Sequence, residues 1–285
     1  MAAGVGASQW VLRTRALEFG RLPRLMGIVN VTPDSFSDGG QFLEPQAAVD
    51  HALRLVAEGA DIIDIGGEST RPFSTPVPAE EELRRVLPVI TALAGRIAVP
   101  ISIDTSKALV AREALQAGAE IINDVTALAG DPEMVSVAAE WRAAVCIMHM
   151  QGTPQTMQIS PTYQDVVAEV FQFLRHRRDA LAAAGIPPER MALDPGIGFG
   201  KTTEHNLQLL RNTWRLHELG CPILVGHSRK GFITRVAGDR PGDPLGGTVA
   251  VALALARQGV QVLRVHDVGL VRQALVLFEA VGGLE

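Results

Sequence analysis

Short apolar runs alternate along the chain with longer segments in which apolar residues recur every three or four positions. The apolar runs have the length of β-strands and occupy residues 25–31, 61–65, 99–104, 120–124, 143–149, 191–193, 222–225 and 260–265. The spacing in the intervening segments predicts helices at residues 46–58, 79–93, 106–117, 132–141, 163–184, 203–218, 228–237, 246–258 and 268–281. Strict alternation of strand and helix is typical of a parallel sheet.

Almost every predicted strand ends in a polar or charged residue. These residues are Asn30, Asp64, Asp104, Asn123, His149, Asp194, His227 with Ser228, and Arg264 with His266. In a (β/α)8 barrel the carboxyl ends of the strands face one rim, where active sites lie. The sequence therefore favours an α/β fold, a single (β/α)8 TIM barrel, over a doubly wound open sheet. Two long loops, residues 32–45 and 66–78, follow the first two of these strands.

Length and composition fit one globular domain. The chain has 285 residues, of which 47% are hydrophobic and 20% charged, and no Pro/Ser-rich linker divides it. We expect residues 1–285 to form a single domain, with residues 1–20 as an extension packed on or near the barrel. A net charge of −5 gives no electrostatic footprint for nucleic acid. The sequence also has no basic face for a membrane and no apolar segment of the ~20 residues that span a bilayer.

Cysteine usage and the amino terminus indicate the cellular setting. Cys146 and Cys221 are the only two cysteines, and neither belongs to a CxxC pattern. Buried thiols in a reducing compartment are the interpretation we favour. Residues 1–20 lack a charged region followed by a sustained apolar stretch, so no signal peptide is evident. We therefore expect a cytoplasmic protein.

Residues 194–201 combine a carboxylate, three glycines, an aromatic ring and a cation in one short loop. Asp194 ends a predicted strand, and the glycines after it let the loop turn tightly and let a ligand approach the backbone. Phe199 adds a flat apolar surface, and Lys201 adds the cation. This stretch is the most informative part of the chain.

Asp104, Asn123 and Asp194 end three different predicted strands. Each could simply stabilise its surroundings, and Asp104 could cap the helix that follows it. If the three converge on one rim, they would instead bind a flat heterocycle with N–H edges. A carboxylate accepts two parallel N–H bonds from an aminopyrimidinone, and an amide serves a neighbouring donor and acceptor.

The loops and the last two strand ends offer candidate groups for an anion. Residues 30–40 and 66–72 could be plain turn-rich loops. The presence of Phe36 in the first also fits a lid, and the glycines beside Arg71 in the second suit an anion. Lys230 lies at a helix start, where a cation opposes the helix dipole and so favours a functional role. Arg264 and His266 share one face of a strand, and an inward Arg264 needs an anionic partner such as a phosphate.

Together these motifs resemble the dihydropteroate synthase family, the folate-pathway enzymes that sulfonamides inhibit. The resemblance spans roughly residues 25–268 and rests on residues 30–40, 66–72, 104–106, 123–124, 194–201, 228–230 and 264–268. It implies a TIM-barrel transferase that condenses 6-hydroxymethyl-7,8-dihydropterin diphosphate with p-aminobenzoate. The products would be 7,8-dihydropteroate and diphosphate, formed through a carbocation-like state of the pterin.

The resemblance also implies roles for individual residues. Those expected to bind the pterin are Asp104, Asn123, Met148, Asp194 and Lys230. Those expected to hold the diphosphate are Asn30, Thr70, Arg264 and His266, with Asn30 also near Mg²⁺, the expected cofactor. Those expected around p-aminobenzoate are Phe36, Arg71, Pro72, Phe199, Lys230 and Gly231. The residues expected to act in catalysis are Asp38, Phe36, Arg71 and Lys230, with Asp38 stabilising the pterin cation.

The family further implies a homodimer, with which the apolar segment 270–278 is compatible. Two other readings of the sequence stay open at this point. A methyltetrahydrofolate–corrinoid methyltransferase barrel would share the pterin carboxylates but would not need the loop around Arg71 or the Arg264–His266 pair. A non-catalytic pterin-binding paralogue should have lost the loop residues that this chain retains. The chain departs from the family pattern at Phe73 and Gly231, both at the p-aminobenzoate end.

Overall fold

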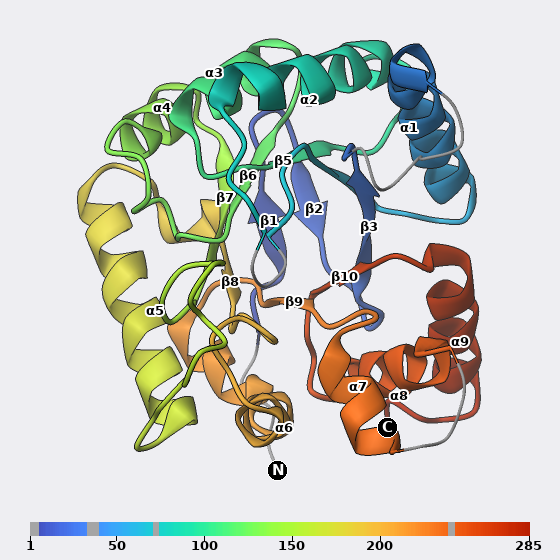
Figure 1. Cartoon of the computed structure of the whole chain (residues 1–285). Coiled ribbons are helices and arrows are strands. Elements are labelled where there is room, and N and C mark those ends of the chain that lie inside the picture. Colours follow the sequence, from blue (N-terminus) through green and yellow to red (C-terminus); the bar gives the residue numbers. More distant parts are fainter. Residues whose placement is uncertain (1–5, 33–39, 71–73, 239–242) are drawn as a thin grey trace.

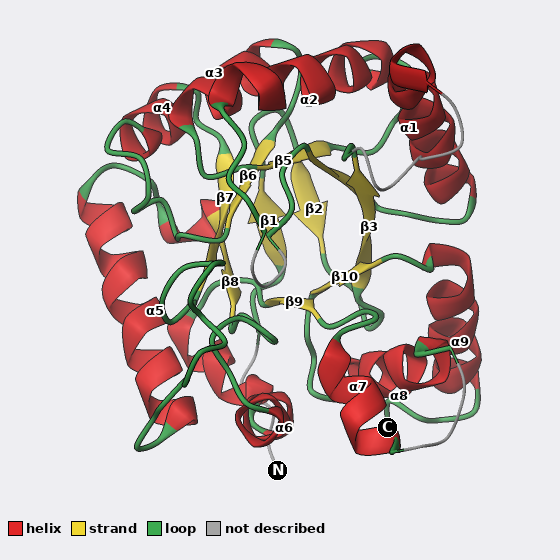
Figure 2. Cartoon of the chain, viewed as in Figure 1, coloured by secondary structure: helices red, strands yellow, loops and turns green. Residues whose placement is uncertain are grey.

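The computed structural model describes residues 6–32, 40–70, 74–238 and 243–285, in which a ring of helices surrounds a barrel of strands (Figure 1, Figure 2). The strands are β1 (Gln9–Val11), β2 (Ala16–Glu18), β3 (Arg24–Asn30), β4 (Ile62–Gly66), β5 (Ile101–Asp104), β6 (Ile121–Asp124), β7 (Ala144–Met148), β8 (Met191–Asp194), β9 (Leu224–Gly226) and β10 (Val262–Val265). The α-helices are α1 (Gly40–Ala57), α2 (Ala79–Leu93), α3 (Ala108–Gln116), α4 (Met134–Glu140), α5 (Val166–Ala183), α6 (Thr203–Arg211), α7 (Gly231–Ala237), α8 (Leu245–Arg257) and α9 (Val268–Ala280).

The barrel is one parallel sheet of eight strands in the order β8-β7-β6-β5-β4-β3-β10-β9. Its two outer strands meet through a bridge between Leu193 and Ile223, where the Leu193 N–H donates to the Pro222 carbonyl at 2.8 Å. Every residue of β4 and β7 is buried, as expected of strands covered on both faces. The sheet therefore closes on itself, and the prediction of a (β/α)8 barrel is confirmed.

Two apolar cores hold the barrel together. The larger lies between the strands and the surrounding helices, and α2 shows how it forms: Val86, Ile90 and Leu93 recur on one helical face and are fully buried. The smaller fills the barrel interior and consists of Trp10, Leu12, Met26, Ile62, Ile121, Ala144, Cys146, Ala192, Leu224 and Val262. Both cores lie below the carboxyl ends of the strands, which they hold in place.

The β1–β2 hairpin closes the amino-terminal end of the barrel. The side chain of Trp10 is fully buried, and its indole N–H donates to the Arg190 carbonyl at 3.0 Å. The backbone N–H and hydroxyl of Thr14 both donate to the Glu120 carboxylate, at 3.0 and 2.7 Å. These contacts attach the hairpin to the end of the barrel opposite the predicted site.

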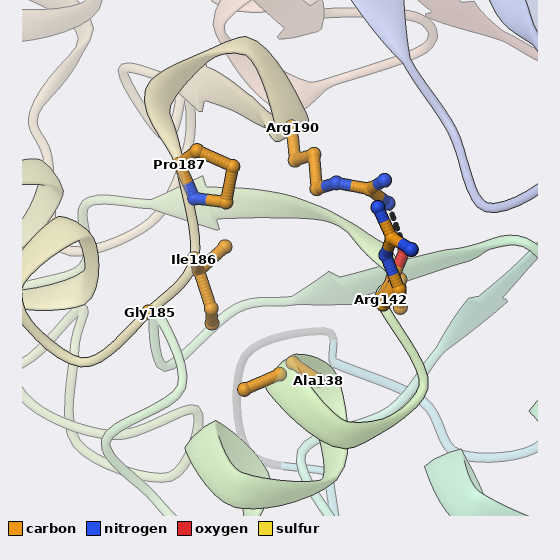
Figure 3. A pocket seen from close by; sticks show the side chains of 8 residues that line it. Ala138, Arg142, Gly185, Ile186, Pro187 and Arg190 are labelled. Carbon is orange, nitrogen blue, oxygen red and sulfur yellow. Dashed lines mark hydrogen bonds between the residues drawn. The ribbon is translucent and has the colours of Figure 1, made fainter.

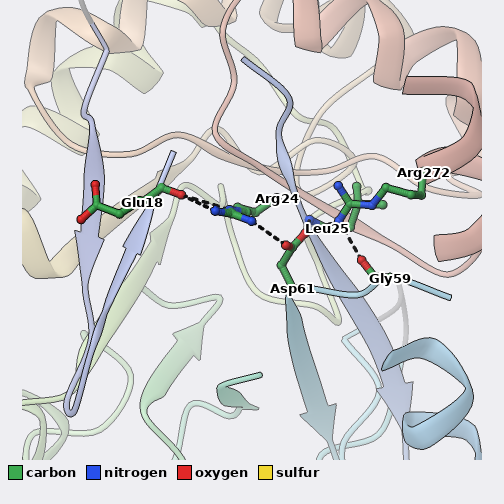
Figure 4. Close-up of polar contacts among 6 residues, drawn as sticks. All are labelled: Glu18, Arg24, Leu25, Gly59, Asp61 and Arg272. Atoms are coloured by element: carbon green, nitrogen blue, oxygen red, sulfur yellow. Dashed lines mark hydrogen bonds and ion pairs between the residues drawn. The ribbon is translucent and has the colours of Figure 1, made fainter. Parts of the chain in front are cut away.

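Asp61 joins this end of the barrel to the last helix (Figure 4). Arg24 donates to the Asp61 carboxylate at 2.9 Å and to the Glu18 carbonyl of the hairpin at 2.7 Å. The Leu25 N–H and the Arg272 guanidinium of α9 also donate to Asp61. The Asp61 carboxylate thus links β3 to α9, and Arg24 extends the contact to β2.

Several predicted helix starts differ from the structure by one to six residues, and α1 and α3 are two of them. Helix α1 begins at Gly40, within the predicted loop 32–45, and continues past Pro45, although a proline inside a helix removes one intrahelical hydrogen bond. Helix α3 begins at Ala108, and Ser106 does not cap it. The Ala108 N–H is satisfied instead by the Asp131 carboxylate at 2.9 Å, a partner distant in sequence.

The helix predicted at residues 203–218 divides into two. Helix α6 ends at Arg211, and a 3-10 helix, Thr213–Leu219, follows it. The Asn212 amide donates to the Gln208 carbonyl and the Thr213 hydroxyl to the Leu209 carbonyl, each at 2.9 Å. These side chains compete with the backbone for the last carbonyls, which ends the α-helix.

Candidate active site

The carboxyl ends of four neighbouring strands bring predicted pterin residues to one rim. Asp104 ends β5, Asn123 lies in β6, Met148 ends β7 and Asp194 ends β8. In the parallel register Asp104 pairs with Asn123, and Met148 pairs with Asp194. The four residues therefore follow one another around the barrel, as the sequence predicts for a shared site.

Arg264 lies on β10 with its guanidinium between two carboxylates. Its Nε donates to Asp64 Oδ2 at 2.6 Å, and its Nη2 donates to Asp104 Oδ2 at 2.7 Å. Burial alone would lower the pKa of Arg264, but these two carboxylates outweigh it and raise the pKa. Burial raises the pKa of Asp104 to about 7 although Arg264 opposes the shift. The anionic partners that an inward Arg264 needs are thus supplied by the protein itself.

The charges of Asp194 and Lys230 influence each other at the rim. Asp194 Oδ1 accepts the Gly196 N–H at 2.7 Å, and burial raises its pKa while Lys230 opposes the shift. The Lys230 ammonium donates to the Ile197 carbonyl and lies 4.3 Å from the centre of the Phe199 ring. Burial lowers the pKa of Lys230 to about 8, against the attraction of Asp194. Lys230 therefore bridges the 194–201 loop and the start of α7.

The 194–201 loop has a backbone that tolerates few side chains. Gly196 and Gly200 both have left-handed φ angles, of +69° and +60°. A Cβ atom on Gly196 would collide with the His149 carbonyl oxygen, and one on Gly200 would lie 2.5 Å from the Gln151 carbonyl oxygen. The loop is thus packed backbone against backbone on the segment after β7.

Lys201 fixes this loop from inside the protein. It is only 1% exposed, and its ammonium lies 3.0 Å from His149 Nδ1 and 2.9 Å from the Phe199 carbonyl oxygen. Burial lowers the pKa of Lys201 to about 7, and burial followed by Lys201 lowers the pKa of His149 to about 3. The cation that the sequence suggested for the loop therefore supports it from below.

The remaining described residues predicted to bind diphosphate lie on the other side of the rim. Asn30 ends β3 and is partly exposed, and Thr70 is partly exposed in the loop after β4. His266 follows β10, with its Nδ1 atom 3.1 Å from the Ser228 hydroxyl. Gly231 is the first residue of α7, directly after Lys230.

Comparison with known proteins adds to this geometry. The family model described as "Pterin binding enzyme" matches residues 26–266. Dihydropteroate synthase from Escherichia coli (strain K12) is 48% identical over 258 residues, which cover 90% of this chain and 91% of that protein. A Xanthomonas albilineans dihydropteroate synthase structure with 4-aminobenzoic acid has a TM-score of 0.89 and 49% identity, covering 97% of this chain and 98% of that one. Another, in complex with 7,8-dihydropteroate, has a TM-score of 0.87 and 47% identity, covering 96% and 98%.

The chain belongs to the dihydropteroate synthase family. Membership confirms the predicted resemblance and the predicted function, and with it the prediction of an enzyme, a transferase. It also decides against a methyltransferase barrel as the nearer relative. The individual roles given to the site residues are not decided by family membership and stay predictions.

Four residues predicted for the dihydropteroate synthase site lie outside the residues that the structure describes: Phe36, Asp38, Arg71 and Pro72. The start of the second loop is described, and the protein holds it firmly. Lys107 forms ion pairs with Glu68 of this loop and with the buried Glu82 of α2, the latter at 2.6 Å. Arg85 of α2 donates to the Gly67 carbonyl at 2.9 Å. Nothing in the local sequence distinguished these anchors from solvated charges.

The amino-terminal side of the barrel carries a separate small cavity of about 200 Å³ (Figure 3). It is lined by Ala138, Ala139, Arg142, Ala143, Gly185, Ile186, Pro187 and Arg190. Arg142 and Arg190 come from the segments that enter β7 and β8, so the cavity lies at the opposite end from the dihydropteroate synthase rim. It takes no part in the site.

The described ranges contain neither a cluster of metal ligands nor a membrane-spanning helix. No group of three or more His, Cys, Asp or Glu side chains there has an arrangement that could hold a metal ion. Among the helices of the same ranges, none combines the length and the apolar character needed to cross a bilayer.

Proposed function

We propose that this chain transfers the dihydropterin methylene group from diphosphate to the amino group of p-aminobenzoate. The C–O bond to diphosphate breaks and its electron pair leaves with the diphosphate. The arylamine nitrogen then bonds to the methylene carbon and loses a proton. The observation that carries this proposal is the convergence of Asp104, Asn123, Asp194 and Lys230 on one rim of the barrel. The relatives bound to 4-aminobenzoic acid and to 7,8-dihydropteroate support the two ends of the reaction.

The pterin slot would be built on the strand ends. Asp194 has one oxygen occupied by the Gly196 N–H, which leaves the other for N–H groups of the pterin. Asn123 offers an amide, and the Lys230 ammonium offers donors for the pterin carbonyl. Met148, only 4% exposed, would line the slot as an apolar wall.

The diphosphate would lie beside this slot, near Asn30, Thr70, His266 and Arg264. The two carboxylates on Arg264 leave it two unused guanidinium hydrogens on Nη1 and one on Nη2, so it can still donate to an anion. The neutral amide of Asn30 at the rim fits Mg²⁺, which binds few protein oxygens and takes substrate phosphates and waters beside them. Asn30 would hold the ion together with diphosphate oxygens, and the ion would supply charge stabilisation for the leaving group.

The p-aminobenzoate would stack near Phe199, whose ring already lies against the Lys230 ammonium. Gly231 begins α7 beside it, and Phe36, Arg71 and Pro72 would complete this subsite from the two loops. Bond breaking leaves positive charge on the pterin, which a carboxylate on the first loop, Asp38, would stabilise. The arylamine is already nucleophilic, so Lys230 would act by orientation and charge and no strong general base is required.

A homodimer and a cytoplasmic location are also part of the proposal. Helices α7 and α8 border an apolar hollow of about 430 Å³ lined by Leu207, Phe232, Ile233, Thr234, Val236, Ala237, Asp243, Pro244, Gly247, Ala250 and Val251. Val236 is 58% exposed there, and a second subunit would cover it. Cys146 and Cys221 are buried and free, which suits a reducing compartment. Light scattering would check the dimer, and a monomer at micromolar concentration would contradict it.

Diphosphate release is the decisive assay for this function. The purified protein should release diphosphate from the dihydropterin diphosphate rapidly only when p-aminobenzoate is present, with formation of dihydropteroate in equal amount. A non-catalytic paralogue would bind the pterin and release nothing. Release at the same rate without p-aminobenzoate would contradict the proposed transfer and point to hydrolysis.

A further inference from the structure

Asp64 is a charged residue in the barrel interior, below the rim that carries the proposed site. It is the third residue of β4, fully buried, and pairs in register with Ile28 on one side and with Ser102 on the other. A buried carboxylate is costly unless its charge is paired. Asp64 meets this need with one oxygen atom that serves two neighbours at once.

The two neighbours of Asp64 are both residues of the proposed site. Asp64 Oδ2 accepts from Arg264 Nε at 2.6 Å and from Asn123 Nδ2 at 3.1 Å. Asp64 thus contacts, from beneath the rim, one residue proposed to bind the pterin and one proposed to bind the diphosphate. Arg264 Nη2 also donates to Asp104 Oδ2 at 2.7 Å. A connected series of polar contacts, from Asn123 through Asp64 and Arg264 to Asp104, therefore lies under the slot.

The contact with Asn123 determines which way its amide points. An ionised carboxylate can only accept, so the atom of Asn123 that faces it must be the nitrogen. The Asn123 carbonyl oxygen and its second N–H then face away from Asp64 in a fixed order. Without the carboxylate the amide could rotate by half a turn at little cost and present the reverse order to a ligand.

We propose that Asp64 is a positioning residue for this site: it fixes the donor and acceptor order that Asn123 presents to the pterin. The inference rests on the proposed function, because it takes Asn123 to contact the pterin. Asp64 acts from below and does not touch the substrate. Its loss therefore harms pterin binding through Asn123, and p-aminobenzoate binding much less.

A double-mutant cycle tests the proposal in the full-length enzyme. Pterin diphosphate affinity is measured by calorimetry for wild type, Asp64→Asn, Asn123→Ala and the double variant. Asp64→Asn should weaken binding about tenfold in the wild-type background, as loss of a charged hydrogen-bond partner does, but less than about threefold when Asn123 is already Ala. The KM for p-aminobenzoate should change less than twofold. Ser102→Ala, at the register partner of Asp64, is the matched control for buried polar changes and should retain wild-type affinity.

Equal losses of pterin affinity in both backgrounds, or no loss in Asp64→Asn, would overturn the proposal. If Asp64→Asn fails to fold, the wild-type protein decides by NMR of the Asn123 side-chain amide, identified as the signal absent from Asn123→Ala. One of its two protons should be protected from exchange before any ligand is added, and rapid exchange of both would overturn the proposal. Failure of wild type itself to bind the pterin diphosphate would instead remove the proposed function.

Discussion

Replacing Asp194 by Asn tests the pterin slot where the structure leaves the new side chain least freedom. Asp194 Oδ1 accepts the Gly196 N–H at 2.7 Å, and this bond will hold the single oxygen of the amide in the same place. The amide nitrogen must then occupy the position of Oδ2, the oxygen we assign to the pterin. An N–H would face the N–H groups of the ligand, where the native carboxylate accepts them.

The size of the effect follows from the bond that is lost. A hydrogen bond to a charged group contributes about 1.5–3 kcal/mol. At about 1.4 kcal/mol per factor of ten, pterin affinity should fall roughly 10- to 150-fold. Stability should change little, because the bond to the Gly196 N–H is kept and an unfavourable buried charge is removed.

Calorimetric titration with the pterin diphosphate measures this loss, and Asp124→Asn provides a matched control. Asp124 is also a buried carboxylate at a strand end, but its oxygens accept from Thr126 and from the Leu128 N–H. The same substitution there should lower the melting temperature and leave pterin affinity within twofold. Unchanged affinity in a folded Asp194→Asn protein, or equal losses in both variants, would refute the role assigned to Asp194.

Three further predictions concern Lys230, the loops and the metal. Burial lowers the pKa of Lys230 to about 8, so pterin affinity should fall as pH rises through about 8, which titrations at pH 7 and 9.5 check. The contribution of Lys230 to stability should instead rise between pH 8 and its usual pKa, because the unfolded chain then binds a proton that the folded chain has lost. Thermal melts over this pH range check that increase. Phe36→Ala and Arg71→Ala should impair p-aminobenzoate capture and leave pterin affinity nearly intact, since loop closure should follow pterin diphosphate binding; calorimetry showing tight p-aminobenzoate binding to the empty enzyme would contradict this order. Turnover should stop in excess chelator and return with Mg²⁺, and diphosphate with Mg²⁺ should raise the melting temperature; full activity in chelator would remove the metal.

The parts of the fold that local pattern controls could be predicted from the sequence. Helix α2 begins and ends at the predicted residues because its apolar positions fall on one helical face and Glu80, Glu81 and Glu82 favour its first turn. The polar strand ends could be assigned to a common rim because a closed parallel barrel brings all carboxyl ends together. The β1–β2 hairpin escaped prediction, since strands of three residues are too short to show alternation.

The pairings inside the site could not be predicted, because they depend on how the barrel closes. Arg264 and Asp64 lie 200 positions apart in the sequence and meet only across the barrel interior. An inward Arg264 was expected to need an anion, but the sequence could not show that Asp64 and Asp104 supply it. The sequence indicates only that Lys201 adds a cation to its loop, and the packing of that loop on the segment after β7 shows that it is buried.

The backbone packing at Gly196 and Gly200 limits how this enzyme could evolve away from an inhibitor. Any side chain at either glycine would collide with the carbonyl oxygen of His149 or Gln151, so substitutions there would damage the fold before they weakened the drug. An inhibitor that rests on the backbone of this loop would therefore meet a surface with few viable escape mutations. Selection for resistance to such a compound should therefore leave Gly196 and Gly200 unaltered.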